Sequence, residues 1–520
     1  MISSRASSRT SDVQYLPRRE SPDVAPMVQT RQGVLRGSVA DGIYAFKGIP
    51  YAAPPFGRNR LRPPQPVEPW SGIRDAVAFG PKAPQPMYPP QVAVLLCEFP
   101  TPAGEDCLTL NVWSRDLGSA RRPVMVWIPG GMFEYHGTGA SPWYDGSRFA
   151  RDGIVCVTVN YRVGVDGFLY LGEGNANRGL LDQVAALEWV RENIAAFGGD
   201  PDNVTLFGES AGAMSVSMLL SMPRADGLFR RAIAQSGAAH HVMSTGSAQR
   251  VGHQLAEKLE VEVTLEALAA VPLGCLLQAQ AELREDLMAR PDPQRWGAEV
   301  VLSTLPWQPV VDGDVLPGRP LDRIAAGAGA GIDLIVGSNT DEHRLFLVTS
   351  GAIDAVTPEA LAGAVAAYGL PVEAALGSYR AAHPEASAGD LLAAVQTDWC
   401  WRIPAIRLAD AHSQRGSATY MYEFAWRSPQ FGGRLGACHG LEIPFVFDTL
   451  GGGTEPLWGA NPPQHLADTM HAAWIAFAAR GECGWPRYEP THRATMRFDV
   501  KSEVVNDPRS AERARWEGVR

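Results

Sequence analysis

The chain has 520 residues, of which 45% are hydrophobic and 20% are charged, and its formal net charge is −10. A chain of this length buries about three-quarters of its surface on folding, and the composition excludes intrinsic disorder. The acidic balance argues against nucleic acid or an anionic membrane as partner, because both need a basic face. No apolar run approaches the roughly 18 residues of a membrane-spanning helix.

The first residues mix serine with arginine and contain no apolar signal segment. We therefore predict a flexible tail over residues 1–27 and a single domain over residues 28–520. The seven cysteines are an odd number scattered along the chain, without a C-x-x-C motif or a His/Cys cluster of metal-ligand spacing. These features predict reduced thiols, a cytoplasmic location, no metal and no cofactor.

The predicted elements follow a proline-dense stretch, 50–102, which we interpret as an irregular segment around the core. Short apolar runs predict strands at 124–128, 154–161, 204–207, 333–337 and 418–426. Helical spacing or helix-favouring composition predicts helices at 179–197, 211–222, most of 245–300 and 350–400, and 466–477. This alternation predicts an α/β fold with a central, mostly parallel twisted sheet flanked by helices, and with helical insertions after the core strands.

One G-x-S-x-G motif occurs, at Gly208-Glu-Ser-Ala-Gly212. It follows a predicted strand and opens a predicted helix, which is the position of a nucleophile elbow. The glycines leave room for a tight turn that exposes the Ser210 hydroxyl, and the helix N-terminus places the Ala211 N–H where an oxyanion would form. The alternative interpretation is a plain strand–turn–helix with a capping serine.

A serine nucleophile needs a base, and the base needs an acid that orients it. His439 lies in a glycine-flanked loop after the strand predicted at 418–426, and Glu342 follows the strand predicted at 333–337. Strand ends are where a sheet presents catalytic groups, and the order serine, acid, histidine matches that of α/β-hydrolases. Spacing alone does not distinguish either residue from an ordinary loop residue.

Many segments along the chain match one known family in order. Among them are Phe46-Lys-Gly-Ile-Pro-Tyr-Ala, Glu105-Asp-Cys-Leu-Thr-Leu-Asn-Val, Asn160-Tyr-Arg-Val-Gly, Gly208-Glu-Ser-Ala-Gly and His439-Gly-Leu-Glu. From Val28 to Trp516 the chain resembles the type-B carboxylesterases, the family of cholinesterases and para-nitrobenzyl esterases. The resemblance implies the α/β-hydrolase fold and serine-dependent ester hydrolysis.

The resemblance also implies roles for single residues. It makes Ser210 the nucleophile, His439 the base and Glu342 the acid. The oxyanion hole would be formed by the N–H groups of Gly131, Met132 and Ala211. Glu209, the acidic neighbour of the nucleophile, and Ser236, which in the family hydrogen-bonds near the triad, would be supporting residues.

Two positions depart from the family pattern. Where the family commonly reads His-Gly-Gly-Gly, this chain reads Pro129-Gly-Gly-Met132. We expect the bulky Met132 side chain to narrow the space beside the scissile carbonyl and to disfavour esters of tertiary alcohols. Asp166 stands where the family is usually apolar or aromatic, so it either pairs with an arginine such as Arg162 or lines the pocket.

Cysteine use differs as well. Secreted relatives pair the cysteine of Glu-Asp-Cys with an upstream cysteine, which this chain replaces by Ala83. Cys107 is then either free or joined to Cys97, and the loss of the upstream partner favours an intracellular protein.

The resemblance leads us to expect two-step hydrolysis of small to medium carboxylic esters, by a monomer or homodimer. The same triad would also serve an acyltransferase, an amidase or carbamate hydrolase, or a thioesterase. A non-catalytic binding module is less favoured, because such relatives have lost the serine. We expect the walls of the substrate pocket around 85–104, 283–310 and 395–402. Trp307, Trp399 and Trp401 are candidate wall residues, although a tryptophan more commonly belongs to the hydrophobic core.

Overall fold

The computed structural model of the protein describes residues 25–95, 101–172 and 174–519. Most of the tail predicted over residues 1–27 lies outside the described residues. Met27, which the prediction placed in that tail, begins the first strand, β1 (Met27–Gln29). β1 forms a small sheet with β2 (Val34–Arg36) and β5 (Ile73–Asp75).

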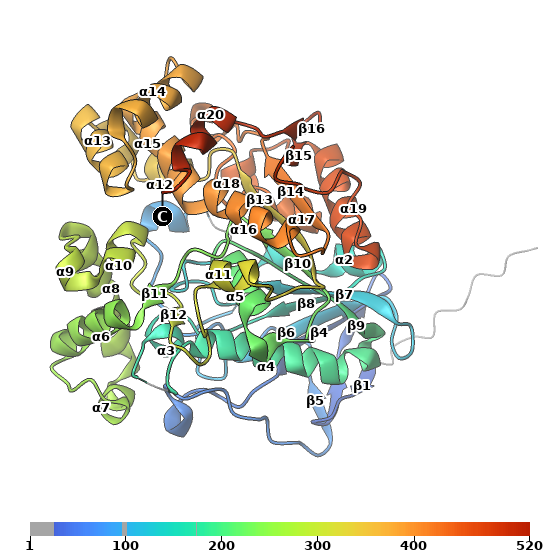
Figure 1. The fold of residues 1–520 in the computed structure, drawn as a ribbon. Helices are drawn as coiled ribbons and strands as arrows, with labels where there is room; N and C mark the ends of the chain where they lie inside the picture. The colour runs from blue at the N-terminus through green and yellow to red at the C-terminus, as the bar shows by residue number, and fades with distance from the viewer. Residues whose placement is uncertain (1–24, 96–100, 173, 520) are drawn as a thin grey trace, which may run out of the picture.

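A large twisted sheet crosses the molecule (Figure 1). In the described residues its spatial order is β16 (Glu503–Asn506), β15 (Ala494–Phe498), β14 (Thr419–Phe424), β13 (Asp333–Asn339), β10 (Arg231–Gln235), β9 (Gly199–Glu209), β7 (Arg122–Ile128), β8 (Val155–Val159), β6 (Thr109–Ser114), β4 (Ile43–Pro50), β3 (Ser38–Ala40). Pairing is parallel from β15 to β8 and antiparallel at both margins. The carboxyl ends of the parallel strands therefore meet at one edge, where functional side chains can converge.

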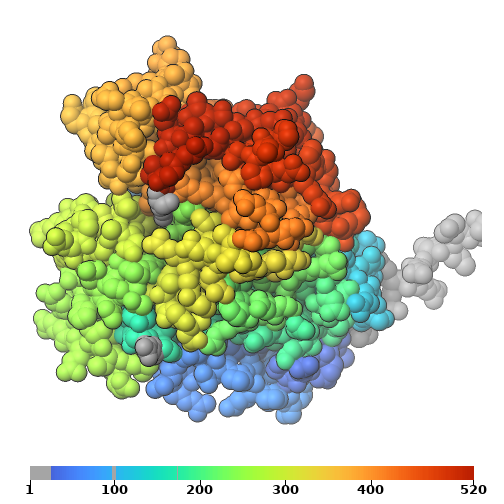
Figure 2. All heavy atoms as spheres, viewed as in Figure 1, coloured from blue at the N-terminus to red at the C-terminus, as the bar shows by residue number. Residues whose placement is uncertain are grey.

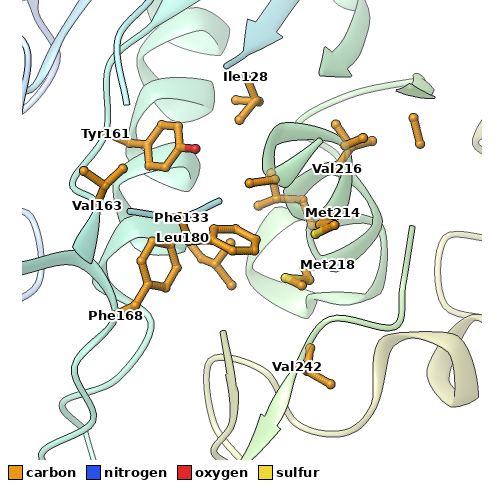
Figure 3. Packing of buried hydrophobic residues seen from close by; sticks show 14 of the residues in the cluster. Ile128, Phe133, Tyr161, Val163, Phe168, Leu180, Met214, Val216, Met218 and Val242 are labelled. Atoms are coloured by element: carbon orange, nitrogen blue, oxygen red, sulfur yellow. The ribbon is translucent and has the colours of Figure 1, made fainter. Parts of the chain in front are cut away.

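The central strands are apolar on both sides because helices cover both faces of the sheet. In β7, Val124 and Val126 belong to one buried cluster, whereas Met125 and Trp127 belong to another on the opposite face. α4 (Arg178–Asn193) and α5 (Ala211–Ser221) contribute to the first cluster, and α19 (Gln464–Arg480) to the second. Figure 3 shows the first cluster, where Met214 and Met218 of α5 lie below the end of β7 at Ile128. The predicted α/β class is confirmed.

Two groups of helices extend from the sheet. The first insertion follows β10 and contains α6 (Thr245–Leu259), α7 (Leu265–Ala270), α8 (Leu273–Ala289), α9 (Pro293–Trp296) and α10 (Ala298–Ser303). The second follows β13 and contains α12 (Arg344–Thr349), α13 (Pro358–Ala367), α14 (Val372–Ala382) and α15 (Ala388–Thr397). They form the green and gold projections in Figure 2, and a cleft of about 440 Å³ is lined by residues of both, including Leu302, Tyr368 and Trp399.

The remaining helices close the fold around the sheet. They are α1 (Pro90–Ala93), α2 (Ser147–Arg151), α3 (Gly164–Phe168), α11 (Pro320–Ala325), α16 (Ile403–Ser413), α17 (Ile443–Phe447), α18 (Glu455–Trp458) and α20 (Ser510–Arg513). No single described helix has the length and apolar composition of a membrane span; α13 and α14 reach that composition only together, and they are bent by 116° at their junction.

Candidate active site

Ser210 occupies the sharp turn between β9 and α5. Its backbone angles, φ 57° and ψ −125°, lie in a strained region that persists only when the surroundings enforce it. The flanking glycines make the turn possible: a Cβ on Gly212 would lie 2.0 Å from the Ile128 carbonyl oxygen, and one on Gly208 would lie 2.7 Å from it. The Ser210 N–H donates to the Gln235 carbonyl of β10, which ties the turn to the sheet. The motif therefore forms the strand–turn–helix that its sequence predicts.

Three residues predicted from distant parts of the chain meet at the carboxyl edge of the sheet. His439 Nε2 lies 2.8 Å from Ser210 Oγ, and His439 Nδ1 lies 2.6 Å from Glu342 Oε2. Glu342 sits in the turn after β13, and its Oε1 accepts the Asn339 N–H at 2.8 Å. The His439 N–H donates to the Glu342 carbonyl. The imidazole thus joins a hydroxyl to a carboxylate, which is the arrangement that a nucleophile, its base and the orienting acid require.

Burial governs the charges around this triad. Ser210 and His439 are each 8% exposed, and Glu342 is fully buried. A second carboxylate, Glu209, places Oε1 3.1 Å from His439 Nε2. Burial raises the pKa of Glu209 to about 8. Burial lowers the pKa of His439, but Glu209 and Glu342 outweigh this effect and raise it to about 9. Because the two groups interact this closely, His439 and Glu209 titrate as a coupled pair.

A third buried carboxyl group, Glu442, was not among the predicted site residues. Its Oε2 accepts from Asn339 Nδ2 at 2.8 Å, and its Oε1 accepts from Gln235 Nε2 at 3.3 Å. Burial and the charge of Glu342 raise its pKa. The sequence does contain a sign that Glu442 is buried: in the His439-Gly-Leu-Glu segment, this glutamate directly precedes the apolar run Ile443-Pro-Phe-Val-Phe.

Ser236 lies in this region, but its hydroxyl does not make the bond that the resemblance implies. It is fully buried, and its N–H donates to the Gly337 carbonyl at 2.9 Å. Among the described residues its Oγ has no hydrogen-bond partner. Its contribution visible in the structure is therefore to join β10 to β13 behind Ser210.

The predicted oxyanion donors lie on two segments next to Ser210, the loop after β7 and the start of α5. The loop after β7 runs directly against the nucleophile, because a Cβ on Gly130 would lie 3.0 Å from Ser210 Cβ. Gly131 and Met132 have left-handed φ angles of 115° and 59°. No backbone hydrogen bond within the described ranges is donated by either N–H, and the Ala211 N–H belongs to the first turn of α5, which a helix leaves unpaired. These donors are available to a developing negative charge.

An aromatic pair covers the imidazole. The rings of Trp401 and Phe346 are stacked, with an interplanar angle of 1°, and their centroids lie 5.0 and 5.6 Å from that of His439. Trp401 belongs to a short π-helical segment, Asp398–Arg402, and such segments are frequent at functional sites. Of the other two candidate tryptophans, Trp399 lines the cleft between the insertions and Trp307 is core. Sequence reasoning missed Phe346, which lies four residues after Glu342.

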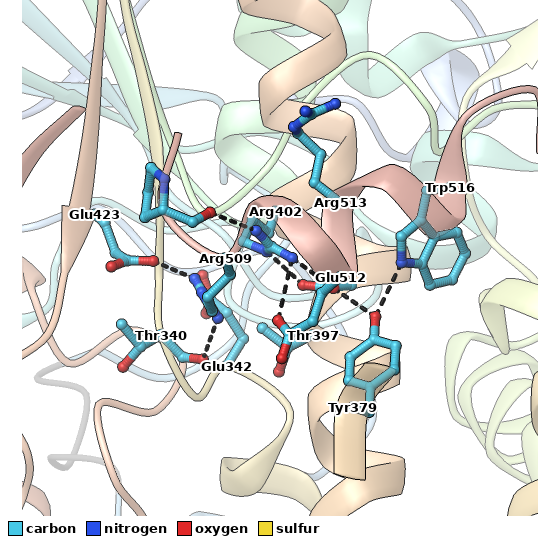
Figure 4. A network of polar contacts seen from close by, with 12 residues as sticks. Thr340, Glu342, Tyr379, Thr397, Arg402, Glu423, Arg509, Glu512, Arg513 and Trp516 are labelled. Atoms are coloured by element: carbon cyan, nitrogen blue, oxygen red, sulfur yellow. Dashed lines mark hydrogen bonds and ion pairs between the residues drawn. The ribbon is translucent and has the colours of Figure 1, made fainter. Parts of the chain in front are cut away.

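A polar network from the C-terminal segment supports the π-helical segment and the turn that carries Glu342 (Figure 4). Arg402 donates to Asp398 at 2.5 and 2.7 Å and contacts Glu512 at 3.4 Å. Arg509 Nη1 donates to the Thr340 carbonyl at 3.4 Å. The C-terminal segment thereby supports the π-helical segment and the turn after β13, both of which lie next to the triad.

Asp166 is paired, but not with Arg162. Its Oδ1 lies 3.3 Å from Arg60 Nε, and both side chains are buried. Arg162 instead binds Asp182 through two N–H groups at 2.7 and 2.8 Å. The prediction named the wrong arginine because Arg60 lies 106 positions upstream, in the irregular segment, where no local spacing connects it to α3.

The cysteines and metal-ligating residues add no second centre in the part of the chain that the structure describes. Cys107 is a free, fully buried thiol, and Cys97 lies outside the described residues. The described residues contain no group of three His, Cys, Asp or Glu side chains that could hold a metal ion.

Comparisons with known proteins place nearly the whole chain in one family. A model of the "Carboxylesterase family" matches residues 24–516. The chain is 38% identical to a para-nitrobenzyl esterase of Bacillus subtilis (strain 168) and 36% identical to a phenmedipham hydrolase of Pseudarthrobacter oxydans, each match covering 94% of this chain and 97% of the relative. A carboxylesterase structure from Geobacillus stearothermophilus superimposes with a TM-score of 0.82 at 38% identity, covering 94% of this chain and 99% of that one.

Proposed function

The chain belongs to the carboxylesterase family, and from this premise we propose that its ester hydrolysis runs through an acyl-enzyme on Ser210. The α/β-hydrolase fold and the hydrolysis of carboxylic esters are shared with its relatives. The observation that carries the proposal is the continuous pair of hydrogen bonds from Ser210 through His439 to Glu342, at 2.8 and 2.6 Å.

In the first half-reaction His439 Nε2 accepts the Ser210 proton, and Oγ attacks the ester carbonyl. The carbonyl π-electrons move onto oxygen, and the N–H groups of Gly131, Met132 and Ala211 bind the resulting oxyanion. The imidazolium then returns its proton to the departing alcohol oxygen, and the acyl group stays on Ser210. Glu342 fixes the imidazole tautomer and stabilises its positive charge.

In the second half-reaction water takes the place of the alcohol. His439 removes a proton from water, the hydroxide attacks the acyl carbonyl, and the same N–H donors bind the second oxyanion. Collapse of this intermediate releases the carboxylic acid and returns the proton to Ser210. Trp401 and Phe346 shield the imidazole from bulk water, which strengthens these electrostatic interactions.

A fluorophosphonate probe tests the role of Ser210, since the activated hydroxyl displaces fluoride and becomes phosphonylated. Wild-type protein should be labelled and lose p-nitrophenyl ester hydrolysis in proportion. The variant Ser210→Ala should be unlabelled and inactive, whereas Ser215→Ala, which changes another buried serine of α5, should retain labelling. Labelling that survives Ser210→Ala would contradict the proposal.

The molecule that accepts the acyl group, the cellular location and the oligomeric state remain predictions. We expect the acyl group to be transferred to water faster than to competing alcohols. Product analysis in the presence of added alcohol measures this ratio. A cytoplasmic location, a single domain over residues 28–520 and a monomer or homodimer are the arrangements that we expect. Nucleic acid and membranes are not expected as partners, because the net charge is −10.

A further inference from the structure

The loop that carries the oxyanion donors is strained. We name residues 130–137 the oxyanion loop. Within it, three non-glycine residues, Met132, Phe133 and His136, have φ angles of 58–59° in the left-handed region. Such conformations persist only where neighbouring contacts enforce them. Phe133 provides one such contact, since it packs against Phe168 with ring centroids 5.0 Å apart (Figure 3).

A buried ion pair holds the other side of the loop. Glu134, which the mechanism does not use, is 1% exposed. Its carboxylate accepts from Arg284 Nη1 at 2.9 Å and from Gln280 Nε2 at 3.2 Å. Gln280 and Arg284 are four residues apart and so share one face of α8. The first helical insertion is thereby attached directly to the oxyanion loop.

Arg284 also contacts the oxyanion residue itself. Its Nη2 lies 3.8 Å from Met132 Sδ, and its guanidinium lies 5.9 Å from the centre of the Tyr135 ring. On the same loop, the Glu134 N–H donates to the Gly131 carbonyl at 3.0 Å. One guanidinium group therefore contacts the Met132 side chain directly and is linked to the Gly131–Glu134 turn through Glu134.

We propose that Arg284 and Glu134 are positioning residues, which hold the Met132 N–H in the oxyanion hole and the Met132 thioether beside the scissile carbonyl. This inference rests on the proposed function. Donors stabilise an oxyanion only when they are held in place before the reaction. Methionine is flexible, so a thioether without the guanidinium would adopt several rotamers and would no longer exclude branched alcohols.

Two variants separate this role from simple structural support. Glu134→Gln with Arg284→Gln removes both charges together and leaves no unpaired buried ion. Arg284→Lys keeps the positive charge for Glu134 but lacks the guanidinium fork that contacts Glu134 and Met132 together. The matched control is Asp286→Asn, which breaks the ion pair of α8 with Lys258, 3.1 Å long, without touching the oxyanion loop.

The experiment measures kcat and KM for p-nitrophenyl acetate, Ki for a trifluoromethyl ketone and Tm. The ketone is chosen because its adduct with Ser210 places an oxyanion in the hole. We expect the double variant to lose on the order of 10-fold in kcat and in ketone affinity, because small misplacements of catalytic groups cost up to about 100-fold. Its KM should change less than about 2-fold, as expected when only the transition state is affected.

Arg284→Lys should raise the rate on a tert-butyl ester relative to the n-butyl ester, and Asp286→Asn should match wild type in every kinetic value. A fall in Tm with kcat, Ki and ester preference unchanged would overturn the inference. If the double variant fails to fold, the ratio of tert-butyl to n-butyl ester hydrolysis in Arg284→Lys tests the inference, and an unchanged ratio overturns it. Wild-type protein that neither hydrolyses the ester nor binds the ketone would instead overturn the proposed function.

Discussion

Glu209→Gln should move the pH dependence of hydrolysis toward acid. The general base must be neutral to accept the Ser210 proton, so activity falls as His439 becomes protonated at low pH. Glu209 Oε1 lies 3.1 Å from His439 Nε2, and the charge of Glu209 has the largest electrostatic effect among the three carboxylates, Glu209, Glu342 and Glu442, that raise the pKa of this imidazole. Replacing the carboxylate by an amide removes that influence while nearly conserving volume.

The size of the effect follows from the His439 pKa, which is raised from 6.5 to about 9. That rise corresponds to roughly 3 kcal/mol, because each pH unit is worth about 1.4 kcal/mol. Glu342 remains in the variant, and Glu209 is itself partly protonated because its pKa is about 8. We therefore expect the acid limb to move down by about 1 pH unit, which increases the neutral imidazole about 10-fold on that limb.

The assay is kcat/KM for a p-nitrophenyl ester between pH 5 and pH 10, since this ratio reports ionisations of the free enzyme. Glu442→Gln is the matched control: it removes a buried carboxylate with a weaker influence on His439, so its acid limb should move less. An acid limb that stays in place in Glu209→Gln, or moves to higher pH, would refute this assignment of charges.

Three further substitutions test separate parts of the account. Met132→Gly should raise the ratio of tertiary to primary ester hydrolysis in a substrate panel; an unchanged ratio would show that this side chain does not limit the alcohol pocket. Gly212→Ala should abolish activity and lower Tm, because the added Cβ would meet the Ile128 carbonyl oxygen at 2.0 Å. Asp166→Asn should lower the free energy of unfolding in urea by about 3 kcal/mol, because Arg60 stays buried without its counter-ion. The same variant should keep the chain-length preference, whereas a changed preference would place Asp166 in the pocket.

Strong local patterns made the central strands predictable. The continuous apolar runs of β7 and β8 reflect burial on both faces. β6 and β10 gave weaker signals, because β6 contains Asn111, whose amide donates to Thr158 Oγ1, and β10 begins with Arg231, whose guanidinium donates to the Ala478 carbonyl. Polar residues are tolerated in buried strands when they are hydrogen-bonded, and the partners of these two lie far away in the sequence.

The triad was predictable because each member lies in a short segment that carries the family resemblance. The support around it was not. Glu134 and Arg284 are 150 positions apart. Phe346 lies in α12, whereas Trp401 lies in the π-helical segment that follows α15. Their meeting depends on how the insertions pack on the sheet, which no local periodicity encodes. The same reason explains why Arg60 was not identified as the partner of Asp166.

The central claim is that Ser210 carries the acyl group, and trapping that intermediate tests it most directly. A slowly hydrolysed p-nitrophenyl ester is mixed with the protein, quenched in acid and digested for peptide mass spectrometry. The account predicts the acyl mass on the peptide that contains Ser210, formed at the rate of the p-nitrophenol burst and absent from Ser210→Ala. An acyl group on another residue, or turnover in Ser210→Ala at the wild-type rate, would contradict it.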